Sequence, residues 1–243
     1  SPACARALKL TIDALEAKGH QVVTFDAPDP LQCLRIASQL LVSDAGKIAL
    51  RKQRCGETND WGVARFIASA RLPRWMKRVY AWYLENIRGD HVWATLVRDW
   101  NEKTITERWD LVAEREGYKA EFFEAWKNSG IDFMLTVPNA TPAIPHHGLY
   151  ESVSSCGYTF MFNLLDYCAG VLPVTKVDKD LDALPADFKP ANRVAAGAYY
   201  NYDAAKMHGL PVGVQVVTER LTEEKAILAM GLVEAALQDS GVV

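Results

Sequence analysis

Four short apolar runs with strand character set the architecture that this chain can adopt. They are HQVVTF at 20–25, IDFMLTV at 131–137, VLPVTKV at 171–177 and LPVGVQVV at 210–217. Valine and other strand-favouring residues are frequent in them, and long stretches with helical periodicity lie between them. Helices that alternate with strands predict an α/β fold in which helices cover a sheet.

The helical stretches have recognisable ends. Pro2 fits the first turn of a helix that ends at Gly19, and Gly130 ends a long helical region that starts near residue 91 and bends near Gly117. Thr222 caps a last helix with acidic residues in its first turn. Further helices are predicted over 31–50, 61–71, 74–88 and 158–167.

Composition excludes several classes of partner and site. The net charge of −3 over 243 residues provides no general basic field, so no nucleic-acid partner is predicted. The five cysteines form no C-x-x-C pair, which argues against a disulfide framework and a thiolate zinc site and favours a reducing cytoplasm. No apolar run approaches the roughly 20 residues that a membrane-spanning helix needs.

The motifs of common catalytic sites are absent from this sequence. It contains no G-x-S-x-G elbow, P-loop, G-x-G-x-x-G turn or H-E-x-x-H helix. Ser154 and Ser155 precede an apolar run, as helix-capping serines do. Cys156 and Cys168 have no basic neighbours, which indicates buried small side chains, and His146–His147 indicates an exposed loop. No catalytic residue, metal ligand or cofactor is therefore assigned.

The predicted helix at 74–88 is strongly amphipathic. Basic residues gather on one side, and Trp75, Met76, Val79 and Trp82 gather on the other. We expect the apolar side to pack on the chain's own domain, with the basic side in solvent. The open alternative is peripheral membrane contact through the four apolar residues, because interfacial helices combine tryptophan with lysine and arginine. A homodimer is a further expectation.

Four stretches, taken in order, resemble the C-terminal part of the amidase signature family, with its fatty acid amide hydrolases and fungal amidases or acetamidases. They are IDFMLTVPNATPAIP, YTFMFNLLDYCAGVLPVTKVD, GLPVGVQVV and TEEKAILAMGLVEAAL. The resemblance implies an α/β fold, the C-terminal part of a mixed-sheet amidase signature fold covered by helices. It also implies that residues 1–243 form the C-terminal section of a single amidase domain, with a helical cap-like insertion at about 60–100.

The resemblance further implies an activity. The family hydrolyses carboxamides with a Ser, cis-Ser, Lys triad, whose residues lie in a Gly-Gly-Ser-Ser-Gly-Gly segment and an upstream lysine segment. This sequence contains neither segment, so it is expected to be a fragment that supplies the substrate-channel half of a hydrolase of carboxylic, including fatty, acid amides. The alternative is a catalytically dead remnant that binds a ligand or partner.

The resemblance also points to substrate-binding positions. Val153, Cys156 and Phe160 would share one helical side on the wall of an acyl channel, and Leu96 and Trp100, one turn apart, would lie at its mouth. The stretch LPRWMKRVYAWYL matches the cap by which similar enzymes dock to membranes. The implied ligand is a small-molecule amide.

Overall fold

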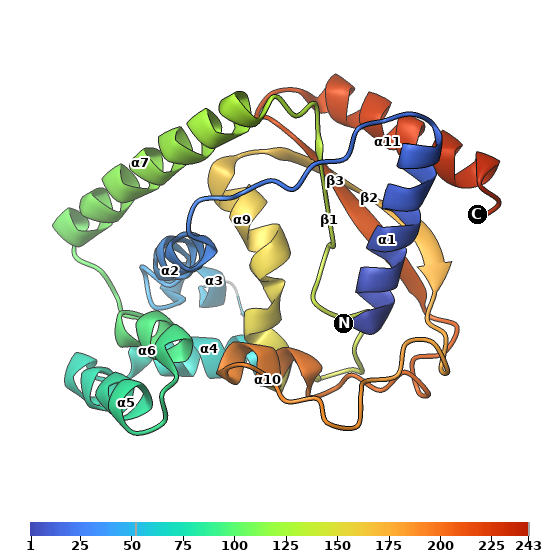
Figure 1. The fold of residues 1–243 in the computed structure, drawn as a ribbon. Helices are drawn as coiled ribbons and strands as arrows, with labels where there is room; N and C mark the ends of the chain where they lie inside the picture. The colour runs from blue at the N-terminus through green and yellow to red at the C-terminus, as the bar shows by residue number, and fades with distance from the viewer. Residues whose placement is uncertain (52, 243) are drawn as a thin grey trace.

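The computed structural model describes residues 1–51 and 53–242, without the side chains of Ala49, Val153 and Ser154. Its sheet has three strands, β1 (Met134–Thr136), β2 (Cys168–Lys176) and β3 (Pro211–Thr218). β3 lies in the middle and pairs antiparallel with both neighbours, with Leu135 opposite Val216 and Gly170 also opposite Val216. Helices surround this sheet (Figure 1).

One face of the sheet is covered by α1 (Pro2–Ala17) and α11 (Glu223–Asp239). Alternate residues of a strand point to the same face, and Val212, Val214 and Val216 of β3 are all buried in this first core cluster. Because these valines share one face, β3 presents a continuous apolar row to α1 and α11, and both helices pack on the sheet through it.

The opposite face carries a second core cluster, built around Val217 of β3. It is formed by three helices: α2 (Pro30–Leu41), α7 (Ile105–Ser129) and α9 (Gly157–Leu165). Tyr118, Phe122 and Trp126 follow the helical spacing along α7 and are buried. Thr104 and Glu107 form a capping box at the start of α7, and Gly130 ends it in the left-handed conformation.

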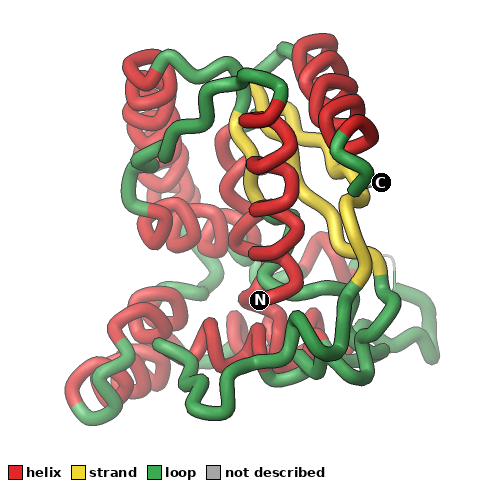
Figure 2. Tube along the Cα trace, turned by 45° about the vertical axis from the view of Figure 1, so that its right-hand side comes forward, coloured by secondary structure: helices red, strands yellow, loops and turns green. Residues whose placement is uncertain are grey.

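A third cluster lies at the end of the molecule away from the strands (Figures 1 and 2). It contains α4 (Trp61–Arg71), α5 (Arg74–Asn86) and α6 (His91–Arg98). We call these three helices the cap. The remaining short elements are α3 (Lys47–Leu50), α8 (Leu149–Ser152), the 3-10 segment η1 (Val153–Cys156) and α10 (Arg193–Tyr199). α8 contacts α4 of the cap, and α10 contacts α6.

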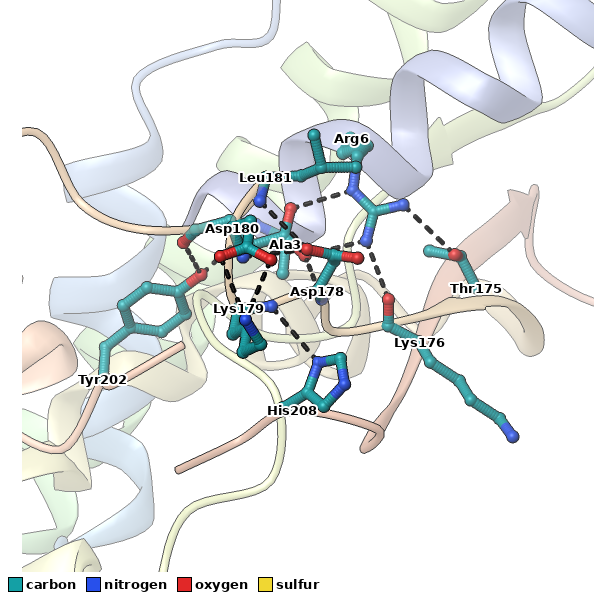
Figure 3. A network of polar contacts seen from close by, with 11 residues as sticks. Ala3, Arg6, Thr175, Lys176, Asp178, Lys179, Asp180, Leu181, Tyr202 and His208 are labelled. Carbon is teal, nitrogen blue, oxygen red and sulfur yellow. Dashed lines mark hydrogen bonds and ion pairs between the residues drawn. The ribbon is translucent and has the colours of Figure 1, made fainter. Parts of the chain in front are cut away.

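A buried ion pair joins α1 to the loop after β2 (Figure 3). The guanidinium of Arg6 contacts the carboxylate of Asp182, and it also donates to Thr175 Oγ1 at 3.2 Å and to the carbonyl of Lys176 at 2.7 Å. The Tyr202 hydroxyl donates to the Asp182 carbonyl at 2.7 Å. The network therefore fixes the loop against the first helix.

The predicted α/β fold class is confirmed, but three local predictions are wrong. The segment 20–25 forms no strand, because no described strand pairs with it. The region 91–129 is two helices, separated at residues 99–104, and α7 passes through Gly117 without a break. The helix predicted over 31–50 ends at Leu41.

Candidate functional site

A cavity of about 1160 Å³ lies between α1, α9 and β1, and we call it the strand-edge cavity. From α1 it is lined by Leu8, Ile12 and Leu15, which share one side of the helix. Every residue of β1 and every residue from 20 to 25 also borders it. From the segment around α9, the lining residues are Ser155, Gly157, Tyr158, Met161 and Phe162.

The predicted channel wall consists of other residues, two from η1 and one from α9. Cys156 and Phe160 are half-buried, and Phe160 packs against the second core cluster. The side chain of Val153 lies outside the described part of the chain. The assignment of these three residues to an acyl channel stays a prediction.

The surroundings of Ser155 and Cys156, as far as the structure describes them, do not favour a nucleophile. Burial raises the pKa of the Cys156 thiol, which disfavours the reactive thiolate. The Ser155 hydroxyl donates to the Ser152 carbonyl at 2.8 Å, so the prediction that Ser155 caps α9 is wrong. The hydroxyl bonds back to the residue before the 3-10 segment instead of to the first N–H groups of α9. The side chain of Ser154 lies outside the described residues.

A second cavity, of about 780 Å³, lies between the cap, α8 and α10, and we call it the cap cavity. Trp100 is part of its wall, and the rings of Phe66 and Trp93 meet Trp100 edge-on with centroids at 4.7 and 5.4 Å. Trp100 Nε1 donates to Ser38 Oγ at 2.9 Å, which fixes the indole. The lining combines these aromatic rings with charged side chains, among them Arg65, Asp90 and Glu151.

The structure brings Leu96 and Trp100 together but keeps them apart from the α9 residues. Leu96 is 1% exposed and, like Trp100, belongs to the third core cluster, whereas Phe160 packs on the second cluster. Two predicted groups of site residues therefore belong to two separate regions of the molecule. Their role as a channel mouth and a channel wall stays a prediction.

Sequence reasoning missed Lys77, which also borders the cap cavity. This lysine is 3% exposed, and its ammonium group donates to the carbonyls of Ala70, at the end of α4, and of Trp100, after α6. Burial, with Lys103 and Arg74 nearby, lowers the pKa of Lys77 to about 8. The only signal in the sequence is the position of Lys77 one turn before Ala81 and two before Leu84, the other buried residues of α5.

The expected packing of α5 is therefore wrong. Its apolar side faces solvent, with Trp75, Val79 and Trp82 exposed by 68%, 60% and 59%. The side with Lys77 packs inward because two main-chain carbonyls bind its ammonium group. A wide apolar face indicates burial in a monomer only when the rest of the chain covers it, and here the described residues leave it open.

The remaining polar candidates are the two adjacent histidines and the basic cluster beside α5. His146 and His147 are exposed, as predicted, and His147 stacks on Trp61 with ring centroids at 4.7 Å. Arg74 pairs with Glu107, which neutralises part of the basic cluster beside α5.

Among the described residues, no group of three or more histidine, cysteine, aspartate or glutamate side chains could hold a metal ion. None of the described helices is long and apolar enough to cross a membrane.

Comparison with known proteins identifies the family. The Amidase family model matches residues 1–227, so the chain belongs to the Amidase family. Fatty-acid amide hydrolase 1 of Sus scrofa is 30% identical over 237 residues, which are 96% of this chain and 40% of that protein. Amidase 1 of Gibberella moniliformis is 27% identical over 245 residues, with 97% of this chain and 40% of the relative covered.

Shorter and structural matches agree with this family. Acetamidase of Aspergillus oryzae is 32% identical over 129 residues, or 51% of this chain and 23% of that protein. A solved structure of a fatty acid amide hydrolase superposes with a TM-score of 0.74 at 18% identity, over 98% of this chain and 37% of that one. The superposition shows a shared fold. The chain spans about 40% of the length of the first two relatives.

Proposed function

We propose that this chain is part of a hydrolase of carboxylic acid amides, including fatty acid amides, and that it supplies the substrate-channel half. The observation that carries the proposal is the Amidase family match over residues 1–227. Relatives whose names specify fatty-acid amide and acetamide hydrolysis support the reaction class. The catalytic serines and lysine belong to polypeptide outside this sequence.

The proposed domain organisation is the C-terminal section of one amidase domain with a cap-like insertion at about 60–100. The cap supports this division, because α4, α5 and α6 have their own core cluster apart from the two clusters on the sheet. The share of the relatives that the chain spans, about 40%, is that expected of one section of a longer domain.

In this proposal the acyl chain passes the cap. Leu96 and Trp100 stand at the mouth, and the aromatic side chains of the cap cavity, Phe66, Trp93 and Trp100, provide apolar surface along the path. Val153, Cys156 and Phe160 form the wall further inside. Burial of an apolar acyl chain against such residues stabilises the complex by roughly 25 cal/mol per Å² of surface removed from water.

The exposed side of α5 favours a second part of the proposal, contact with a membrane surface. Trp75, Met76, Val79 and Trp82 all project from the cap into solvent. Met76 also borders the cap cavity, so an amphiphilic amide could reach the cavity from the membrane. The competing function is a remnant without catalysis that binds an apolar partner through the same side chains.

A chimeric enzyme tests the proposed reaction. In Amidase 1 of Gibberella moniliformis, the stretch matched by this chain is replaced by residues 1–243, and we call this protein the chimera. Release of carboxylate from a panel of amides is measured by mass spectrometry. We expect hydrolysis by the chimera and none by the isolated chain. A chimera that melts cooperatively but hydrolyses no amide would contradict the proposal, as would hydrolysis by the isolated chain.

A further inference from the structure

Lys77 is buried in the cap without a carboxylate partner. It is 3% exposed, and none of the ion pairs between described lysines and acidic residues involves it. Its ammonium group instead donates to the carbonyl of Ala70 at 2.8 Å and to that of Trp100. Lysines are rarely buried to this extent unless they are paired. A buried lysine without a counter-ion therefore indicates a chemical role for the amine itself.

The hydrogen bonds of Lys77 suit a neutral amine as well as an ammonium ion. An ammonium group has three N–H donors, and the described residues accept two of them. A neutral amine keeps two N–H groups, which are enough for both carbonyls, and its lone pair takes the remaining position of the tetrahedral nitrogen. Loss of one proton therefore breaks neither bond and leaves a nucleophile.

The surroundings of Lys77 favour this neutral form. Burial is the largest cause, Lys103 and Arg74 add positive charge nearby, and Asp99 acts in the opposite direction, so that the pKa of Lys77 is lowered to about 8. At about pH 7.4 roughly a fifth of Lys77 is then neutral, compared with about 0.1% for a lysine of ordinary pKa, about 10.4. Burial and a neighbouring cation are the means by which lysines become nucleophiles for carbonyl compounds.

The cap cavity places aromatic surface beside this amine. Lys77 borders the cavity, whose volume is about 780 Å³, and roughly 150 Å³ is enough to hold benzene. Phe66, Trp93 and Trp100 also line it, with the rings in edge-on contact. Trp100 joins the two features, because its carbonyl accepts from Lys77 and its residue forms part of the aromatic wall. Aromatic ligands gain edge-on or stacked contacts at such walls in addition to apolar burial.

We propose that Lys77 is a covalent binding site for small aromatic aldehydes that enter the cap cavity. The Nζ lone pair attacks the aldehyde carbon, and a proton moves from nitrogen to oxygen to give a carbinolamine. The oxygen then leaves as water, and a C=N bond joins the ligand to Lys77. Nothing is oxidised or reduced, and addition of water reverses the reaction. A protonated imine keeps one N–H group, so one of the two carbonyls loses its donor.

Reductive trapping tests the proposal. The protein is incubated with benzaldehyde and sodium cyanoborohydride at about pH 7.4, so that the imine is reduced to a stable secondary amine, and labelled lysines are located by mass spectrometry of peptides. The reference is Lys176, which is exposed, forms no described ion pair and extends away from the polar network in Figure 3. We expect labelling of Lys77 at least about tenfold faster than that of Lys176. Equal rates would overturn the proposal.

Lys103 separates the effect of the cavity from that of burial. Its pKa is also lowered, mainly by burial, but it is not among the residues that line the cap cavity. Labelling of Lys103 as fast as that of Lys77 would overturn the assignment to the cavity. Propanal tests the ligand class, because it lacks the ring. A preference for Lys77 over Lys176 that is as large with propanal as with benzaldehyde would overturn the choice of aromatic aldehydes.

Two substitutions on α4 test access through the cavity. Ser69 borders the cap cavity, whereas its exposed neighbour Ala68 does not. Ser69→Phe should fill part of the cavity and slow labelling of Lys77 at least about fivefold, while Ala68→Phe should leave it unchanged. Equal labelling in both variants would overturn this access. Melting curves check that both variants fold, and if Ser69→Phe does not, the comparison of Lys77 with Lys103 in wild type decides.

Unfolding provides a last control. In concentrated urea the preference for Lys77 over Lys176 should disappear, because the unfolded chain exposes both amines. A preference that persists would show that local sequence causes it and would overturn the site. Labelling is measured in this chain and in the chimera, so the test does not require that either folds alone. A chimera that hydrolyses amides without preferential labelling of Lys77 would contradict only this inference.

Discussion

Arg6 and Asp182 form a bidentate ion pair, in which Arg6 Nε and Nη2 donate to the two carboxylate oxygens at 2.8 and 2.7 Å. The Asp182 side chain is 1% exposed and that of Arg6 25%. Burial is the largest single influence and raises the pKa of Asp182, but hydrogen bonds from Arg6 and the Asp178 N–H group outweigh it and hold the pKa below its usual range. The pair fixes the loop after β2 on α1.

We expect Arg6→Met to lower the free energy of unfolding by about 3–5 kcal/mol, because the buried carboxylate would lose its counter-ion. The matched control is Lys9→Met on the same helix. Its exposed pair with Asp13 should contribute no more than about 1 kcal/mol. Urea unfolding measures the free energy of unfolding of both variants. Equal decreases relative to wild type would contradict a special role for Arg6.

The same pair predicts a pH dependence. Because the pKa of Asp182 is lowered in the folded chain, the unfolded chain binds more protons near pH 4. The stabilisation is present above the unfolded pKa, about 3.9, and is lost as pH falls through the folded pKa. Wild type and Asp182→Asn should therefore approach one another in unfolding free energy below that pH. A constant difference would contradict this assignment.

Lys77 predicts that the free energy of unfolding also depends on pH in the alkaline range. Its pKa is lowered to about 8, mainly by burial, so the unfolded chain binds more protons between that pH and about 10.4. Unfolding free energy should rise with pH across this interval. Lys77→Met should remove this contribution and also cost about 1–3 kcal/mol, because two buried carbonyls lose their donor. Chemical unfolding of both proteins at several pH values measures the difference, which should grow with pH.

Gly213 of β3 should not tolerate a side chain. A Cβ atom at Gly213 would lie 2.5 Å from the main-chain oxygen of Leu172, beside the irregular register between Pro173 and Thr175. We expect Gly213→Ala to lower stability by about 1–3 kcal/mol through overpacking. Gly117→Ala is the control, because its Cβ atom would meet nothing within 4 Å and alanine favours α7 by up to about 1 kcal/mol. Melting curves that shift in the same direction would refute this reading.

The sequence predicts best those elements whose signals are local. α4 and α5 begin and end close to the predicted limits, because Asp60 and Pro73 precede them and apolar periodicity continues through each helix. The run at 210–217 is strand β3, whose alternate valines are buried. Local capping and periodicity thus recover most helices and the last two strands.

What the sequence could not predict depends on partners distant in the chain. The run 20–25 has strand composition, but a strand also needs a neighbour, and the described residues provide none. The orientation of α5 follows from carbonyls at Ala70 and Trp100, which bind Lys77. Amphipathicity alone favours burial of the tryptophans. The predicted substrate-binding residues rest on family resemblance, and no local pattern distinguishes Phe160 from Phe162 as a channel or a core residue.

That distinction provides the most direct test of the account. The measurement is kcat/KM of the chimera for an acetamide-sized and a long-chain amide, with Phe160→Ala and Phe162→Ala as paired variants. Phe160 is half-buried, whereas Phe162 is 5% exposed. We expect Phe160→Ala to reduce long-chain turnover selectively, by about 1–3 kcal/mol of transition-state binding. Phe162→Ala should lower stability by about 3–5 kcal/mol without selectivity. Equal losses on both substrates for Phe160→Ala, with a large fall in melting temperature, would contradict the proposed substrate channel.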